Sequence, residues 1–209
     1  MAEQSTPKKE ITSEDLPKKE ITSEELHGYI KQTVNKLGPN VSKEQKKEYA
    51  KLMVKIFEKG MSPKDAMEIS DEMVAQIYSY AYSKFSAGHY SDARELFKVM
   101  LSLEPLNADF ATALGICHHK LKDYEYALYC YMLGTFLDLK SPVCLFYAYD
   151  CYASQNNDVA AGVMLCNVIA RCGSEPMYDH IRNDAQVRLA ALEKRLVEGQ
   201  AAMINNTAA

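Results

Sequence analysis

The sequence predicts an all-α fold in which antiparallel pairs of helices stack side by side. One observation is a chain motif that returns after 34 residues. The matched residues are Tyr90 with Tyr124, Ala93 with Ala127, and Phe97 with Tyr131. A second observation is that apolar residues recur at helical spacing on both sides of this region. Repetition at a period of 20 to 50 residues is typical of repeat proteins, in which each unit is one small supersecondary motif.

Three consecutive windows carry the repeat: 74–107, 108–141 and 142–175. Their pattern resembles the tetratricopeptide repeat, a helix-turn-helix unit of 34 residues. The matching residues of the first two windows are Ala81, Gly88, Tyr90, Ala93, Phe97 and Pro105, then Leu114, Gly115, Tyr124, Ala127 and Tyr131. The third window is degenerate: it keeps Ala148, Tyr152, Ala161 and Leu165, while Asp158 replaces the turn aromatic and Gly173 the closing proline.

The spacing has a physical cause. Two antiparallel helices approach closely only where side chains are small, so Ala81 should face Ala93, and Gly115 should face Ala127. Gly88 permits the tight turn between the helices of the first pair. Because one pair cannot bury its own apolar face, the pairs are expected to stack into a superhelix with atypical terminal units.

Helices are also expected on both sides of the repeats. Ser42 and Gln45 form a capping-box signature at the start of a helix over 42–59, which Gly60 ends. A short helix should follow from Pro63. A capping helix over 176–198 should bury a stripe made of Ile181, Ala185, Leu189, Leu192 and Leu196.

The resulting organisation has four parts. Residues 1–41 are predicted to be a flexible charged tail, since 7–16 (PKKEITSEDL) and 17–26 (PKKEITSEEL) are a near-perfect duplication poor in large apolar residues. The remaining parts are N-terminal helices over 42–70, with a possible role in dimerisation, three repeats plus capping helix over 71–198, and a disordered tail over 199–209.

Composition excludes several function classes. The formal net charge is only −4, which argues against a dominant role with nucleic acid. No apolar run is long enough for membrane insertion, and the N-terminus lacks the apolar core of a secretory signal, so a cytoplasmic protein is expected. The six cysteines form no C-x-x-C pair, so reduced, structural thiols are predicted, without metal or cofactor.

The concave surface of the stacked repeats is the predicted binding site, because the first helix of each pair should line it. Tyr78, Tyr82 and Phe85 follow one another at i, i+4 and i+7. Exposed apolar grooves usually mark binding sites, and aromatic grooves suit extended segments that contain proline. The other candidate groove residues are Thr112, Ile116, His119, Phe146 and Asp150. The alternative is that the aromatics pack against the N-terminal helices.

Beyond the repeat consensus, the chain resembles the class II chaperones of bacterial type III secretion, the small tetratricopeptide chaperones of translocator proteins. The resemblance covers about 50–170 and rests on IYSYAY, the GHYSDA turn, LGIC, KDYEYALYCY and DLKSP. It implies a bacterial cytoplasmic chaperone whose groove binds a P-x-L-x-x-P type segment of a translocator, or of a gatekeeper protein. It also implies a homodimer through N-terminal helices. The apolar residues there are Tyr49, Leu52, Met53, Ile56 and Phe57.

Two other functions compete with this reading: a general tetratricopeptide adaptor and a purely structural oligomerisation module. An enzyme is not expected. His119 and Asp150 could be imagined as a pair, but no nucleophile with a supporting base and no glycine-rich phosphate loop emerges.

Overall fold

The structure is a computed structural model that describes the backbone of residues 21–207 and the side-chain surroundings of residues 21–198. It divides into two compact units, Met1–Met61 and Ser62–Ala209, which are described separately. Most of the duplicated segment 7–26 lies outside the described residues. The described helices are α1 (Ser23–Asn35), α2 (Lys43–Phe57), α3 (Pro63–Ala66), α4 (Asp71–Ser86), α5 (Tyr90–Leu103), α6 (Ala108–Lys120), α7 (Tyr124–Leu137), α8 (Val143–Ser154), α9 (Asp158–Cys172), the 3₁₀ helix η1 (Pro176–Tyr178) and α10 (Asp179–Thr207).

The first unit contains a helix where the sequence predicted a flexible tail. The prediction of a tail over 1–41 is wrong for α1, which begins with a capping box made by Thr22 and Glu25. Its residues Ile30 and Val34 are buried. Composition alone does not predict α1, because a few apolar residues at helical spacing are enough to stabilise a helix when a second helix covers them. The helix α2 begins at the predicted capping box of Ser42 and Gln45.

Polar contacts close both ends of the α1–α2 pair. At one end the Ser23 hydroxyl donates to the Glu58 carboxylate at 2.6 Å, and His27 lies 3.6 Å from the same carboxylate. At the other end the Lys46 ammonium donates to the carbonyl oxygens of Asn35 and Leu37, at 3.4 and 3.0 Å. The carbonyls at the end of α1 therefore have a cationic partner, which suits the negative end of a helix.

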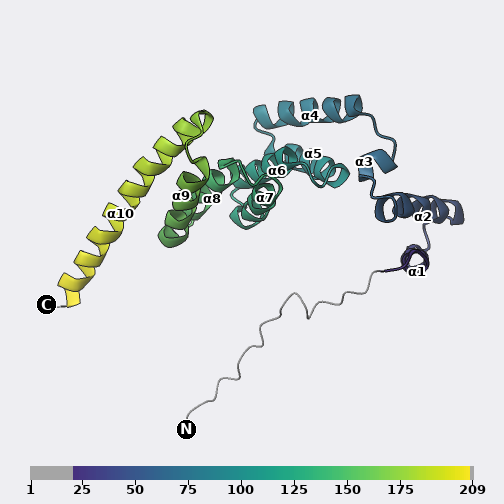
Figure 1. The fold of residues 1–209 in the computed structure, drawn as a ribbon, viewed down its shortest axis with the longest axis horizontal. Helices are drawn as coiled ribbons and strands as arrows, with labels where there is room; N and C mark the ends of the chain where they lie inside the picture. Colours follow the sequence, from purple (N-terminus) through teal and green to yellow (C-terminus); the bar gives the residue numbers. More distant parts are fainter. Residues whose placement is uncertain (1–20, 208–209) are drawn as a thin grey trace, which may run out of the picture. The chain divides into compact units, whose positions relative to one another are not determined.

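The second unit consists of stacked helical pairs, as predicted. Figure 1 shows α5 to α9 following one another in chain order, and contacts run mainly between consecutive helices. The described chain contains helices and no strand. The pairs α4–α5, α6–α7 and α8–α9 correspond to the three predicted repeats. The all-α, tetratricopeptide-type architecture is confirmed.

The turn inside each pair has the same backbone conformation. Gly88, Lys122 and Asn156 are spaced by the repeat length and have φ values of 80°, 61° and 56°. This left-handed conformation costs glycine nothing, is common for asparagine, and is uncommon for other residues. The degenerate third repeat therefore keeps the turn geometry, even though its turn aromatic is missing.

Small residues bring the paired helices together. Ala81, Ala93 and Ala127 are fully buried. A Cβ atom added to Gly115 would lie 2.6 Å from the ring of Tyr131, which is itself fully buried. The absence of a side chain at Gly115 thus makes the room that the aromatic ring of the facing helix fills.

The core of the second unit is a row of three apolar clusters rather than one centre. One joins α4, α5 and α6 around Phe97 and Met100, the next joins α7 and α8 around Tyr131, and the third joins α9 and α10 around Leu165 and Val168. Such a row is expected when each repeat contacts only its neighbours.

The capping helix differs from its prediction in two respects. It runs from Asp179 to Thr207, past residue 198, so residues 199–207, predicted as a disordered tail, are helical. Ala185 and Leu192 are buried as predicted, but Leu196 is 38% exposed. The apolar stripe ends before the helix does, because α9 begins at Asp158, which pairs with Arg195, and so leaves the rest of α10 uncovered by α9.

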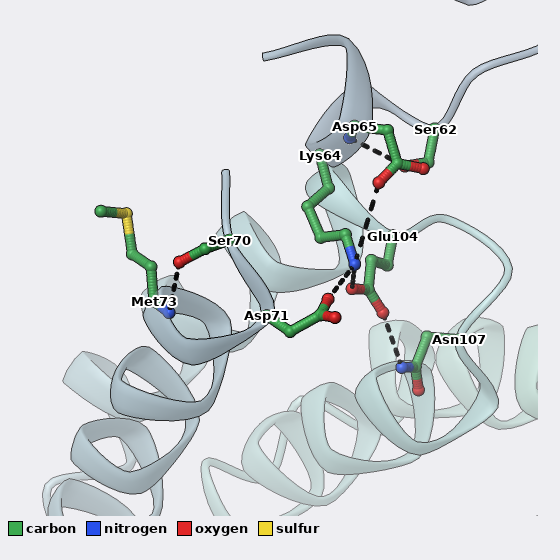
Figure 2. A network of polar contacts seen from close by, with 8 residues as sticks. All are labelled: Ser62, Lys64, Asp65, Ser70, Asp71, Met73, Glu104 and Asn107. Atoms are coloured by element: carbon green, nitrogen blue, oxygen red, sulfur yellow. Dashed lines mark hydrogen bonds and ion pairs between the residues drawn. The ribbon is translucent and has the colours of Figure 1, made fainter. Parts of the chain in front are cut away.

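A lysine holds the short helix α3 against the first repeat. The Lys64 ammonium lies 2.5 Å from Asp71 at the start of α4 and 3.2 Å from Glu104 at the end of α5. Glu104 in turn accepts from the side-chain amide of Asn107, which caps α6 (Figure 2). The paired carboxylates raise the pKa of Lys64 above its usual range, and Lys64 lowers the pKa of Asp71. One cation therefore organises the ends of four helices.

All six cysteines are free thiols. Four are buried, and Cys166 is exposed on α9. Burial raises the pKa of Cys117 and of Cys151 to about 12, which keeps both thiols protonated and unreactive. The predicted role of packing residues fits the buried cysteines and not Cys166.

Replacing Gly115 tests the close approach of α6 and α7. Gly115→Ala should lower the free energy of unfolding by about 1–3 kcal/mol, since overpacking outweighs the better helix propensity of alanine. The measurement is chemical denaturation followed by circular dichroism. The control is Gly28→Ala in α1, where an added Cβ meets nothing within 4 Å and stability should not fall. Equal effects of both substitutions would contradict the proposed packing constraint.

Candidate functional site

Two stacked tyrosines on α4 form the exposed aromatic surface that the sequence predicted. Tyr78 and Tyr82 are 42% and 59% exposed, and their ring centroids lie 6.5 Å apart with an interplanar angle of 13°. The Tyr78 ring also meets Phe97 of α5 edge-on and lies 6.3 Å from the ring of Phe110 of α6. Tyr78 is thus held in place by the repeat core, while Tyr82 faces solvent.

Phe85, the third predicted aromatic, is placed differently. It is partly buried against the first core cluster, and its ring meets Tyr90 of α5 at 5.2 Å. The i, i+4, i+7 spacing put it on one stripe with the tyrosines, but Tyr90, at the start of the partner helix, covers it. The open part of this aromatic surface is therefore Tyr78 and Tyr82.

Thr112 and Ile116 are the smaller predicted groove residues of α6. Ile116 is partly buried and packs against the cluster around Tyr131. The Thr112 hydroxyl donates to the Ala108 carbonyl at 2.8 Å and lies 3.0 Å from the thiol sulfur of Cys144 in α8. Thr112 also borders a recess of about 110 Å³ between α6, α7 and α8.

His119 sits among tyrosines near the end of α6. Its ring lies 5.6 Å from Tyr124 and 6.4 Å from Tyr131, and its Nδ1 is 3.5 Å from the Tyr131 hydroxyl. Burial lowers the pKa of His119 below its usual value near 6.5, although the carboxylate of Asp150 opposes this shift. The neutral imidazole is therefore the favoured form in the folded protein, and His119 and Asp150 influence each other's pKa through their charges.

An arginine of the capping helix packs against the predicted site residues of the third pair. The Arg188 guanidinium of α10 lies 5.0 Å from the centroid of the Phe146 ring and 5.4 Å from that of Tyr149. It also forms ion pairs at 3.0 Å with Asp150 and with Asp184. Phe146 and Asp150 thus face α10.

Arg188 is the contact that the sequence reasoning missed. The sequence prediction for the capping helix considered only the apolar residues expected to be buried, and Arg188 is not among them. Arginine prefers stacked aromatic partners and fork-shaped carboxylate contacts, and Phe146, Tyr149 and Asp150 provide both.

The chemistry available on this surface is that of exposed aromatic rings with hydroxyl groups. Stacked exposed tyrosines offer flat apolar area together with hydroxyl groups at little cost in conformational entropy. No group of three or more metal-ligating side chains occurs within the described residues. None of the helices described is both long enough and apolar enough to cross a membrane.

The predicted dimerisation residues lie on one flank of α2. Tyr49 and Phe57 are 46% and 63% exposed. Leu52 and Met53 are partly buried and, with Tyr49, line a recess of about 300 Å³ that Leu37 and Val41 complete. This flank is an apolar surface that α1 covers only in part.

No family model matches the chain. Among curated relatives, low calcium response locus protein H of Yersinia pestis is 32% identical over 84 residues, which are 40% of this chain and 50% of the relative. The chain therefore spans about half the length of the curated relatives it matches.

The solved structures that resemble the chain include SycD, the type III secretion translocator chaperone of Yersinia enterocolitica. One SycD structure is 25% identical, with a TM-score of 0.60 over 63% of this chain and 98% of SycD. A second, of SycD with a peptide of the translocator YopD, has a TM-score of 0.58 at 25% identity, over 61% of this chain and 98% of SycD. A further SycD structure is described as an alternative dimer.

The architecture is that of a tetratricopeptide-type helical repeat protein. Among such proteins, the structural neighbours are translocator chaperones, which confirms the resemblance to the class II chaperones of type III secretion.

The buried position of His119 predicts a pH dependence of stability. Its pKa is lowered in the folded state, so between the folded value and about 6.5 the unfolded chain binds more protons. Stability should therefore fall as the pH drops from about 7 through this window. His119→Gln, which cannot titrate, should show a smaller loss of melting temperature between pH 7.5 and pH 5.5 (about two pH units). A loss equal to that of the wild type would contradict the assignment.

Proposed function

We propose that this protein is a cytoplasmic chaperone of bacterial type III secretion, which binds an extended segment of a translocator protein and keeps it competent for export. The observation that carries the proposal is the exposed, stacked pair Tyr78 and Tyr82 on the first helix of the first repeat. The proposed role is binding rather than catalysis, as it is for the neighbouring chaperones.

The nature of the bound segment follows from the surface. Aromatic rings stacked along one helix suit a stiff, proline-containing segment, because such a segment loses little entropy when it binds. SycD, which shares the fold, was crystallised with a peptide of its translocator YopD. For this chain we expect a segment of the P-x-L-x-x-P type, from a translocator or a gatekeeper protein, that contacts Tyr78 and Tyr82 directly.

The remaining predicted groove residues are proposed to have two different roles. Ile116, His119 and Thr112 form the floor beside the tyrosines. Phe146 and Asp150 interact with Arg188, so they shape the far end of the groove together with α10. Phe85 is proposed to support the tyrosines from the core rather than to touch the cargo.

Truncation of Tyr82 tests the groove. Tyr82→Ala should weaken binding of a fluorescent P-x-L-x-x-P peptide by about 1–3 kcal/mol, the usual loss for an anchor residue, with the melting temperature nearly unchanged. The measurement is fluorescence anisotropy together with thermal unfolding.

The matched control is Tyr129→Ala on α7, because Tyr129 is 61% exposed and belongs to the second helix of its pair. It should leave peptide affinity unchanged. If Tyr82→Ala lowers stability and not affinity per folded molecule, the surface is structural. If the peptide does not bind at all while unrelated cytoplasmic proteins do, the general adaptor is the better reading.

We further propose a homodimer through the apolar flank of α2. Tyr49, Leu52, Met53, Ile56 and Phe57 supply the apolar area that a self-associating surface needs. Leu52→Glu should shift the protein toward monomer in sedimentation equilibrium, at concentrations where the wild type is dimeric. Lys47→Glu, on another side of α2, should leave the association unchanged. Retention of the dimer by Leu52→Glu would overturn this surface.

A further inference from the structure

The first unit contains a groove that the proposed cargo site does not use. It runs between α1 and α2 and has a volume of about 890 Å³. Its apolar floor includes Ile30 and Val34 of α1 and Ala50 and Val54 of α2. We call it the lysine groove, because seven lysines border it, from Lys31 on α1 to Lys59 just after α2.

The charge around the lysine groove has one sign. Residues 21–61 hold eight lysines and five carboxylates. Seven of these lysines line the groove, and none of the five carboxylates does. Only Lys36 lies elsewhere.

The lysines of α2 follow a regular spacing. Between Lys43 and Lys59 a lysine stands at every fourth position, so the row runs along one face of the helix. Like charges at i and i+4 destabilise an isolated helix. The lysine row of α2 therefore lowers the stability of the helix instead of supporting it. This spacing is also the sequence signal that could have revealed the groove.

Internal ion pairs neutralise only part of the row. Lys51 pairs with Glu48 at 2.8 Å, and the Lys46 ammonium donates hydrogen bonds to the carbonyl oxygens at the end of α1. Within the described part of the chain, Lys31, Lys43 and Lys47 have no carboxylate partner. Uncompensated cations therefore flank the apolar floor from both helices.

We propose that the lysine groove binds an acidic, amphipathic helical segment of another protein. Apolar residues of the segment would cover the floor, and aspartates or glutamates on its flanks would pair with the lysines. This is the usual way in which an amphipathic helix enters a groove. From Lys43 to Lys55 the groove follows α2 for about 18 Å, enough for about three turns of a bound helix.

The charge distribution selects this occupant over a second copy of the chain. Two copies that joined through this groove would set one lysine row against the other, and like-charge contacts across an interface are costly. The proposed dimer flank, with Leu52 and Met53, faces a different side of α2. A flat anionic membrane would meet the lysines but could not reach an apolar floor recessed between two helices.

The experiment uses the full-length protein and a labelled synthetic helix. The probe has leucines at i, i+3, i+4 and i+7 and glutamates on both flanks; a matched probe has glutamines in their place. Binding is followed by fluorescence anisotropy at low and at physiological salt. The acidic probe should bind, the neutral probe should bind at least about tenfold more weakly, and added salt should weaken the acidic probe.

Variants locate the binding. Lys31→Glu with Lys47→Glu should weaken the acidic probe by about tenfold or more. Lys36→Glu, which reverses one lysine charge outside the groove where the double variant reverses two inside it, should leave the affinity unchanged. Val54→Asp should weaken it through the floor, and circular dichroism checks that each variant is folded. Tyr82→Ala should have no effect, which separates this proposal from the cargo site.

Three results would overturn the proposal. Equal losses per reversed charge in the Lys36 and Lys31/Lys47 variants would mean attraction to net charge alone. Binding to vesicles that contain anionic lipid, lost in the Lys31/Lys47 variant while the acidic probe fails to bind, would assign the groove to a membrane surface. Loss of self-association in the Lys31/Lys47 variant and not in Leu52→Glu would assign it to a second copy.

Discussion

The close approach of paired helices at small side chains is the constraint on which the second unit depends. Ala81 and Ala93 bring α4 and α5 together, and Gly115 leaves the space that Tyr131 fills. Because this contact fixes the axis of each pair, it also fixes which face of the first helix remains uncovered. On α4 that face carries Tyr78 and Tyr82. The exposed aromatic surface proposed for binding is thus a consequence of packing on the other side of the same helix.

The same constraint explains why so much of the fold could be predicted from the sequence. Small residues, aromatics and turn positions must recur together if the pairs are to stack, and their 34-residue period is visible without any structure. The left-handed turns at Gly88, Lys122 and Asn156 show that the period survives where the residue type does not. Side-chain direction was harder to predict. Phe85 shares the stripe of the tyrosines, yet Tyr90 covers it, and Phe146 meets Arg188, which lies far along the chain in α10.

The N-terminal region shows where composition misleads. A charged, duplicated sequence predicted a flexible tail, and the end of that stretch forms α1. The helix α1 is stabilised by its contacts with α2. Ile30 and Val34 are buried by α2, and hydrogen bonds of Ser23 and Lys46 join the two ends of the pair. The capping box of α2 was enough to predict that helix, whereas the few apolar residues of α1 were not. The pairing that buries α1 also creates the lysine groove, so the first unit carries a chemistry that differs from the aromatic surface of the repeats.

Site-specific photocrosslinking inside the cell tests whether a secreted protein lies against the Tyr78–Tyr82 surface, as proposed. A photoreactive phenylalanine analogue would replace Tyr82 in one strain and Tyr129 in another, and mass spectrometry would identify the crosslinked peptide. Position 82 should capture a proline-containing segment of a type III secreted protein, and position 129 should not. Capture of that segment from position 129 alone, with none from position 82, would contradict it.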